Sequence, residues 1–571
     1  MQIHNGQVIA SATDIVGFLH CEHLTWLERQ AALGAIQRPA NDHPMLELLR
    51  GEGHAHEDNY RETLKRDGLR VEDATQGKNA GGSTTPAPGS RQAQLQASSK
   101  RTIDLMSDGV DVIYQATFAD NTSDPQVIGF ADFLRRVDDN SDLGDWAYEP
   151  EDTKLSSHVS AWAVLQLCVY AELLERVQGR QPDYVHVVLG SGERASIRLA
   201  EIASYFRKAK ERFNAFIAAN APHPPYPLPV SHCARCGWQP HCSQQWRNDD
   251  HLSQVAFIRM DQVRKLERAG VTTMTALAQQ RDDLSVPNIG DETVGRLVNQ
   301  ARLQVAAQVD QPPPWRALPP PEAGLGLSML PEPSKGDVFY DIEGHPYAIP
   351  GGLEYLHGLG TVKRGTFTFI EHWAHDIREE RRAFENVIDF FIKRKKKWPD
   401  MHVYHYAHYE VTALKKMAMR HGTREDELDE LLRSETFVDL YKVVRQGVLV
   451  GVSSYSIKRL EPLYMAARVG DIGNGGSSIL EYEKWRNDQG DDSILDEILL
   501  YNKDDVESTQ LLRDWLEERR SELIHDGIAV PRPEVKDIDL GAKINLAIQQ
   551  RVDSLLAGID SAVIERIRNS R

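Results

Sequence analysis

The chain alternates short apolar runs with longer stretches of helical periodicity, a pattern that predicts an α/β protein with more than one domain. In its first part, strands are predicted at 109–118, 127–137, 146–155 and 184–189, and helices at 11–33, 44–67, around 160–174 and at 199–219. Residues 72–100 are rich in Gly, Ser, Thr, Pro, Gln and Ala without either period. A mobile excursion is therefore expected there, at least to about residue 90.

From residue 246 onwards, the pattern of apolar and polar residues predicts a different order of elements. Residues 246–310 are predicted to be helical. Leu-Glu-Arg-Ala-Gly-Val at 266–271 and the Pro-Asn-Ile-Gly turn at 287–290 resemble helix–hairpin–helix modules, with a plain helical spacer as the alternative. Two Pro-Pro-Pro runs make 311–336 a predicted stiff linker. Strands at 338–344 and 401–406, with helices from about 411, at 453–463 and at 494–516, assign 337–525 to a further domain. Residues 526–571 are expected to form a C-terminal helical tail.

Polar residues interrupt two adjacent predicted strands and the helix that follows them. Asp152 and Lys154 share a strand face, and Asp132 lies on the neighbouring strand. Two carboxylates form a hard oxygen site that suits Mg²⁺ or Mn²⁺, and a lysine beside it can orient a water. Gln166 and Tyr170 fall on one helix face, where they can grip a phosphate or a base. Asp-x-Lys alone occurs by chance in most proteins, so the ordered set carries this prediction.

Three cysteines follow a proline-rich bend with the spacing C-x2-C-x5-C: Cys233, Cys236 and Cys242. In a cytosolic protein such a spacing indicates a metal or cluster rather than packing or disulfides. The fourth ligand is expected to be Cys21, because Cys168 lies within the long helix and is predicted to be buried; His241 is a weaker alternative. Four thiolates fit either a tetrahedral zinc or a [4Fe–4S] cluster.

A second acidic set follows the proline-rich stretch: Asp341-x-Glu343, Glu410 and Tyr501-x3-Asp505. The first two acids share a strand face, and Tyr501 and Asp505 share a helix face. Asp439 and Asp504 are rival carboxylates. Asp439 is expected to be mainly structural, and Asp504 is expected to point away from the Tyr501 face.

Composition limits the classes of protein that fit. A chain of 571 residues is too long for one core. Its net charge of −18 argues against a general polyanion binder, although basic patches and metal ions can still contact nucleic acid. The basic run 393–397 is either such a patch or a solvated helix end. Without a run of about 20 apolar residues or a signal sequence, a cytoplasmic protein without membrane partners is expected.

The ordered set Asp132, Asp152-x-Lys154 and Gln166-x3-Tyr170 resembles the PD-(D/E)XK nuclease core of the RecB and AddB type. The resemblance implies a restriction-endonuclease-like fold over residues 1–245 and an upstream histidine at the metal, for which His56 is the candidate and His54 the rival. One cysteine before this core and three after it resemble the iron–sulfur subgroup, which includes AddB and the CRISPR adaptation nuclease. That likeness favours a [4Fe–4S] cluster over zinc on the four cysteines, stapling the domain without taking part in hydrolysis.

The second acidic set resembles the DEDDy exonucleases, which have the RNase H-like fold of polymerase proofreading domains. The resemblance implies that the four acids bind two metal ions, that Tyr501 orients the attacking water, and that residues 337–525 trim 3′ ends. Glu410 departs from the pattern, because this motif normally supplies aspartate. Its longer side chain can still ligate a metal, but with a different geometry.

The whole order resembles the RecB-like nuclease family, in which an iron–sulfur PD-(D/E)XK domain precedes an RNase H-like domain. Many relatives continue into a superfamily I helicase, whereas this sequence has no G-x4-G-K-[ST] loop; it is a natural short form, a truncated product or the partner of a separate helicase. The hypothesis is a metal-dependent DNA exonuclease for repair, processing or defence, with two centres acting on single strands or DNA ends. The alternatives are one active centre beside a binding platform, RNA as the second centre's substrate, and a non-enzymatic DNA-binding scaffold.

Overall fold

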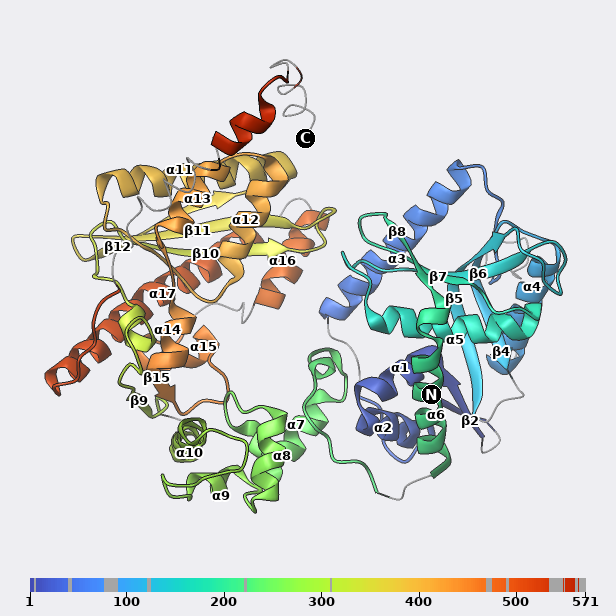
Figure 1. Ribbon diagram of the computed structural model, residues 1–571, viewed down its shortest axis with the longest axis horizontal. Coiled ribbons are helices and arrows are strands. Elements are labelled where there is room, and N and C mark those ends of the chain that lie inside the picture. Colours follow the sequence, from blue (N-terminus) through green and yellow to red (C-terminus); the bar gives the residue numbers. More distant parts are fainter. Residues whose placement is uncertain are drawn as a thin grey trace. The chain divides into compact units, whose positions relative to one another are not determined.

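The structure, a computed structural model, describes residues 1–4, 7–39, 44–75, 91–120, 125–219, 223–308, 311–468, 475–488 and 492–533, with 548, 550–559 and 563. The chain divides into two compact units, Met1–Gln245 and Trp246–Arg571 (Figure 1). Within these ranges, no helix is long and apolar enough to cross a membrane.

The first unit is built on one mixed sheet. Its strands in the described ranges are β1 (Gln2–His4), β2 (Gln7–Ser11), β3 (Val71–Asp73), β4 (Val112–Asp120), β5 (Gln126–Val137), β6 (Ala147–Thr153), β7 (Tyr184–Val188) and β8 (Arg194–Arg198). The long strand β5 is central: it runs antiparallel to β4 and β6 and parallel to β2. Beyond it, β6 and β7 are parallel, and β8 closes that edge as an antiparallel strand. The four strands predicted in this part of the sequence are confirmed to within a few residues.

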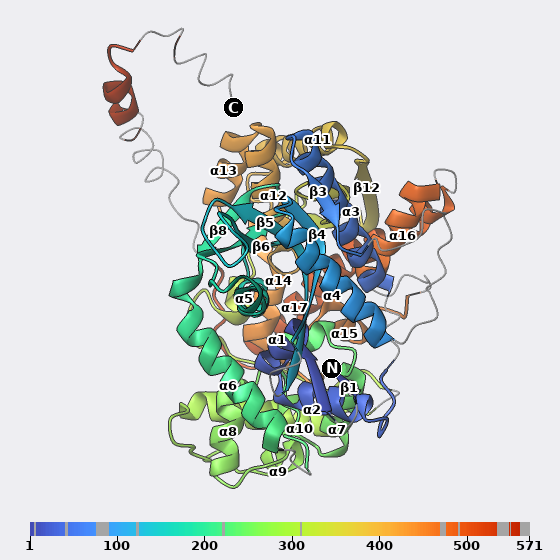
Figure 2. The ribbon, with the colours of Figure 1, turned by 90° about the vertical axis from the view of Figure 1, so that its right-hand side faces the viewer.

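The helices that accompany this sheet are α1 (Ala12–His20), α2 (Glu22–Ala32), α3 (Pro44–Arg66), α4 (Arg91–Ser107), α5 (Ala161–Gln178) and α6 (Ala203–Ala219). The next helix, α7 (Gln239–Asn248), runs across the boundary between the two units. Helix α5 is apolar on most of its circumference and is largely buried against the sheet; Figure 2 shows it nearly end-on. The excursion expected over 72–100 is wrong for residues 91–100, which belong to α4. That helix forms because its later residues Leu105 and Met106 are buried in the sheet's core. Residues 76–90 lie outside the described ranges.

The helix predicted over 11–33 is two helices that meet at Cys21. Cys21 has extended backbone angles, ends α1 and begins α2. Its sulfur accepts a hydrogen bond from the backbone N–H of Leu24, which is the role that an N-cap side chain plays. Cys21 therefore stands at a break in the helix and not within a helical face.

The second unit centres on a five-stranded sheet in the order β12-β11-β10-β13-β14. These strands are β10 (Val338–His345), β11 (Leu353–Lys363), β12 (Thr366–Trp373), β13 (Val403–His405) and β14 (Phe437–Asp439). The first three form an antiparallel meander, and β13 and β14 add to β10 in parallel. The central strand β10 is buried along most of its length, which explains its apolar Val-Phe-Tyr start.

Two helical layers enclose this sheet. The helices are α11 (Ile377–Lys397), α12 (Tyr409–His421), α13 (Glu425–Arg433), α14 (Leu440–Gly447), α15 (Ile457–Leu460), α16 (Gly475–Asp488) and α17 (Ser493–His525). Helices α11, α12 and α13 share one apolar core with the sheet, and α14 and α17 share another. Ahead of the sheet, α8 (Met260–Arg268), α9 (Met274–Ala278) and α10 (Asp291–Ala306) pack around a small core of their own.

Residues 311–336 do not form the stiff linker predicted from their prolines. β9 (Trp315–Ala317) pairs antiparallel with β15 (Val448–Val450), and Leu327 and Leu330 are completely buried in the core beside α14. The prolines flank the short strand and leave these apolar side chains free to pack. This segment is therefore part of the second unit's core.

Candidate metal centre

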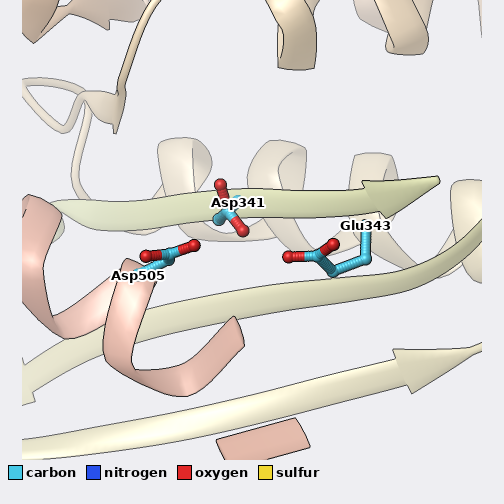
Figure 3. A group of neighbouring side chains, drawn as sticks. All are labelled: Asp341, Glu343 and Asp505. Carbon is cyan, nitrogen blue, oxygen red and sulfur yellow. The ribbon is translucent and has the colours of Figure 1, made fainter. Parts of the chain in front are cut away.

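Three carboxylates converge on the central strand of the second unit. Asp341 and Glu343 project from β10, and Asp505 faces them from α17 (Figure 3). One oxygen of each lies within 4.8 Å of the others, and within the described ranges this is the one group of three or more potential ligands that meets this spacing. A cluster of carboxylate oxygens is the ligand set that Mg²⁺ and Mn²⁺ prefer. The described residues thus fit a divalent cation at this point.

Glycines on β11 allow α17 to approach the sheet closely. A Cβ atom at Gly358 would lie 1.9 Å from Asn502 Oδ1, and one at Gly360 would lie 2.7 Å from Val506 Cγ1. The close approach lets Asn502 Nδ2 donate to Asp341 Oδ2 at 2.7 Å. It also brings Asp505, one helical turn further along, over the acids of β10.

Burial and mutual repulsion shift the proton equilibria of these acids. The pKa of Asp341 is well above its ordinary value because of burial, with Asp505 and Glu343 adding to the effect. Burial, and then Asp505, raises the pKa of Glu343 to about 8. Burial also raises the pKa of Asp505 against the opposing effect of Arg468. Clustered acids of this kind hold protons unless a cation compensates their charge.

Tyr501 lies one turn before Asp505 on the same helix and is buried. Its hydroxyl accepts a hydrogen bond from Lys458 Nζ. The pKa of Tyr501 is raised because of burial and because of Asp505 and Glu343. Tyr501 therefore keeps its own proton, which remains available to an acceptor at the acidic site.

Glu410 stands beside the three carboxylates without joining their close group. It lies in the first turn of α12, and its Oε2 is 3.4 Å from His405 Nδ1. It does raise the pKa of Asp341, after burial, Asp505 and Glu343. Of the rivals, Asp439 accepts from the backbone N–H groups of Ala407 and Tyr441 at 3.0 Å each and caps α14.

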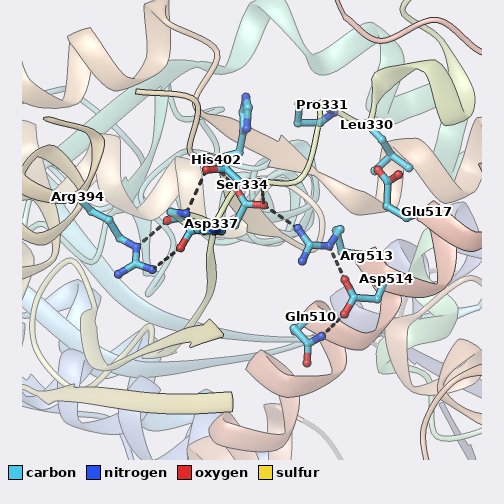
Figure 4. Close-up of polar contacts among 12 residues, drawn as sticks. Leu330, Pro331, Ser334, Asp337, Arg394, His402, Gln510, Arg513, Asp514 and Glu517 are labelled. Carbon is cyan, nitrogen blue, oxygen red and sulfur yellow. Dashed lines mark hydrogen bonds and ion pairs between the residues drawn. The ribbon is translucent and has the colours of Figure 1, made fainter. Parts of the chain in front are cut away.

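A buried ion pair fixes α17 against the start of β10. Arg513 Nη1 lies 2.7 Å from Asp337 Oδ2 at only 8% and 3% side-chain exposure (Figure 4). Asp337 also accepts from the N–H groups of Ser334 at 2.8 Å and His402 at 3.0 Å. The guanidinium lies over the rings of Phe339 and Tyr404, at 4.9 and 5.0 Å. Since Asp341 and Asp505 belong to the same strand and helix, this pair helps to set their separation.

The first unit brings Asp132 and Asp152 together as predicted from the strand pattern. β5 and β6 pair with Phe133 opposite Glu151, so the two aspartates face each other on one side of the sheet. The pKa of Asp132 is well above its ordinary value because of burial and the adjacent Asp152. Lys154 forms an ion pair with Asp152. Burial opposes its charged form, but Asp152 and Asp132 outweigh burial and raise the pKa of Lys154.

Helices α5 and α3 carry the other residues that were predicted for this site. Within the described ranges, His56 does not form a close ligand group with Asp132 and Asp152. Gln166 Nε2 donates to the Tyr170 hydroxyl at 2.8 Å, and Asp152 contributes, after burial, to the raised pKa of Tyr170. His56 Nε2 is buried, and no hydrogen-bond partner is found for it in the described part of the chain. The pattern did not single out Glu57, yet this buried carboxylate raises the pKa of both Asp132 and Lys154. His54 is exposed.

Four cysteines gather at the end of the first unit: Cys21, Cys233, Cys236 and Cys242. Burial raises the pKa of the Cys242 thiol to about 12, and the other three thiols add to this shift. The N–H groups of Leu24 and Val230 each lie 3.4 Å from a thiol sulfur of this group. Cys168 is buried within α5, as predicted, and His241 is exposed.

One comparison with known proteins identifies part of the second unit. Residues 338–517 match the model of the RNase_H superfamily, a span that runs from β10 into α17 and includes all three close carboxylates. No curated protein sequence matches the chain. Residues 338–517 are therefore an RNase H-like domain, which indicates a metal-dependent nuclease-type function on nucleic acid.

Proposed function

We propose that the protein is a metal-dependent deoxyribonuclease with two hydrolytic centres, acting as an exonuclease on single strands or DNA ends. The observation that carries the proposal is the close group of Asp341, Glu343 and Asp505 within an RNase H-like domain. A second acidic pair, Asp132 and Asp152 with Lys154, supports an independent centre in the first unit.

In the second centre, Asp341, Glu343 and Asp505 would hold divalent cations, and Glu410 would extend the set to four acids. A divalent cation held by these acids would supply an activated water and stabilise the leaving 3′ oxygen. Tyr501 orients the nucleophile: because Lys458 occupies its oxygen as a donor, its O–H proton can point to the water or to a phosphate oxygen. Trimming from a 3′ end is what the resemblance of this acidic set to the DEDDy exonucleases implies.

In the first centre, Asp132, Asp152 and His56 would hold Mg²⁺ or Mn²⁺. The buried Nε2 of His56, which lacks a partner among the described residues, suits a ligand role. Lys154 would hold the attacking water beside the metal, because its ammonium is paired with the Asp152 carboxylate. Gln166 and Tyr170 would guide the strand from α5.

The four cysteines are proposed to hold a [4Fe–4S] cluster that joins the break before α2 to the end of the first unit. A tetrahedral zinc with Zn–S bonds of about 2.3 Å would hold sulfurs within about 4 Å of one another. In the described part of the chain, no three of these thiols are found within 4.8 Å of each other. The thiols therefore do not already stand in zinc geometry, and the preference for the cluster rests on the resemblance to the iron–sulfur subgroup of nucleases.

Protein purified without oxygen is expected to be brown, with a broad visible absorbance band and about four iron atoms per chain, because four thiolates are the usual ligands of such a cluster. Cys236→Ser should lose the band, whereas Cys168→Ser should keep it, since Cys168 is buried in α5. A colourless protein that contains stoichiometric zinc contradicts the cluster assignment.

The function is tested with end-labelled single- and double-stranded DNA and RNA in Mg²⁺, Mn²⁺ or EDTA. Lys154→Ala and Asp341→Ala are each expected to leave part of the cleavage, and the double variant is expected to abolish it. If one single variant removes all cleavage, only that centre is active and the other domain is a binding platform. Cleavage of RNA alone by Lys154→Ala makes the second centre a ribonuclease. If the wild type binds DNA without cleaving DNA or RNA, the protein is a non-enzymatic DNA-binding scaffold.

Metal binding is expected to stabilise the second unit more strongly as the pH rises. The folded-state pKa of Glu343 is about 8, against an ordinary value of 4.5. At a pH below 4.5, the raised pKa of Glu343 contributes its full stabilisation to the folded state. That contribution is lost as the pH rises towards 8. Thermal unfolding in EDTA and in Mg²⁺, from pH 5 to 8, measures the effect. A metal-induced gain in melting temperature that stays constant over this window contradicts it, and Glu343→Gln should flatten the pH dependence.

A further inference from the structure

Two cations reach the acidic group of the second unit from the segment that begins with α15. Arg468 Nη2 lies 2.5 Å from Asp505 Oδ1, and Arg468 Nε donates to Glu461 Oε2 at 3.0 Å. Lys458 Nζ donates to the Tyr501 hydroxyl and lies 3.8 Å from the centre of that ring. Neither cation belongs to the ordered acidic motifs, yet each contacts one of their residues.

The ion pairs with Asp505 and Glu461 use only part of the Arg468 guanidinium. Its Nη1 atom is buried, and among the described residues no hydrogen-bond partner is found for it. The side chain is only 14% exposed, so this donor has little access to water. A buried guanidinium N–H without an acceptor is costly. The Nη1 group of Arg468 is therefore a hydrogen-bond donor without an acceptor among the described residues, beside the carboxylates that would bind the metal.

A phosphate group is a suitable acceptor for the Arg468 Nη1 donor. A guanidinium presents two parallel N–H groups that match two oxygens of a phosphodiester, and an ammonium adds a point charge. Arg468 already has Glu461 as a second carboxylate partner, so it can leave Asp505 without becoming unpaired. Lys458 adds a positive charge at the Tyr501 hydroxyl, and that charge attracts a phosphate.

We propose that Lys458 and Arg468 form the phosphate-binding site of the second centre, and that Arg468 holds Asp505 only until a divalent cation takes that carboxylate. The ligand is a backbone phosphate of a nucleic-acid strand, and the inference rests on the proposed nuclease function of the same site. Arg468 and the metal compete for Asp505. A phosphate that draws Arg468 away therefore favours metal binding, and the metal favours phosphate binding by the same factor.

This arrangement gives Arg468→Ala two effects of opposite sign. Without the competing cation, Asp505 is free, so Mn²⁺ should bind about fivefold more tightly when no nucleic acid is present. Without the guanidinium, a labelled oligonucleotide should bind about tenfold more weakly. A residue that merely maintains the fold would weaken both affinities together.

The experiment uses the full chain with Asp152→Asn, which removes a ligand from the first centre. Electron paramagnetic resonance of free Mn²⁺ gives the metal affinity, and fluorescence anisotropy in Ca²⁺ gives the affinity for short single-stranded DNA and RNA. Lys458→Ala should weaken oligonucleotide binding about tenfold without weakening Mn²⁺ binding. Arg459→Ala is the matched control: Arg459 is the exposed neighbour of Lys458 and should change neither affinity.

Circular dichroism melting and the conservative Arg468→Lys variant separate these effects from misfolding, because Arg468→Lys should restore part of the oligonucleotide affinity. The proposal is overturned if Arg468→Ala leaves oligonucleotide binding unchanged, or weakens Mn²⁺ binding. Failure of the proposed function has a different signature. The wild type would then bind metal and oligonucleotide with the expected coupling and still not cleave.

Discussion

Asp341→Asn, in a chain whose first centre is silenced by Lys154→Ala, is expected to lower Mg²⁺-dependent cleavage at least about 10³-fold, because a metal contributes several kcal/mol to such a transition state. Asparagine has nearly the same shape and can still accept the hydrogen bond that Asn502 donates. The folded structure should therefore survive the change. What is lost is one carboxylate charge from the group of three.

Release of nucleotides from a 3′-labelled single strand measures this effect, with the melting curve as the check on folding. Asp504→Asn is the matched control, because Asp504 neighbours Asp505 in sequence but is not in the close group. It should retain most of the activity. If Asp341→Asn keeps near-wild-type cleavage while Asp504→Asn loses it, the ligand set of the second centre is wrongly assigned.

The parts of the site that follow strand and helix periods were predictable from the sequence. Asp341 and Glu343 lie two apart on an apolar strand, and Tyr501 and Asp505 lie four apart on a helix. Such local spacing survives folding because the backbone period sets it. The local pattern does not predict which helix packs over which strand. The glycines at 358 and 360 permit the close approach of α17, but that contact joins residues far apart in the sequence.

Residues outside any periodic motif were missed. Arg468 and Lys458 resemble ordinary solvated charges in the sequence, and only the tertiary fold brings them to Asp505 and Tyr501. Glu57 follows His56 on α3, and nothing in the local pattern indicates that its buried carboxylate acts on Asp132 and Lys154. The prolines of 311–336 predict a linker, although apolar leucines lie between them. These leucines are buried only because α14 lies beside them.

The buried pair between Arg513 and Asp337 leads to the largest expected effect on stability. Asp337→Ala should lower the free energy of unfolding of the second unit by about 3–5 kcal/mol, since it leaves a buried guanidinium without its main partner. Asp514, at 2.7 Å and half exposed, can compensate for only part of that loss. Asp429→Ala is the matched control, because its pair with Arg433 is about half exposed and should contribute less than about 1 kcal/mol.

Urea unfolding of the full chain measures these differences, and the double variant Asp337→Ala/Arg513→Met tests their origin. Removing both charges should cost less than the sum of the single changes, because the double variant leaves no uncompensated ion in the core. Asp505 lies eight residues before Arg513 on α17, about 12 Å along the axis, so a loosened helix should also weaken Mn²⁺ binding at Asp341. A stability loss without any loss of metal affinity would mean that the glycine contacts of β11 alone hold α17 in register.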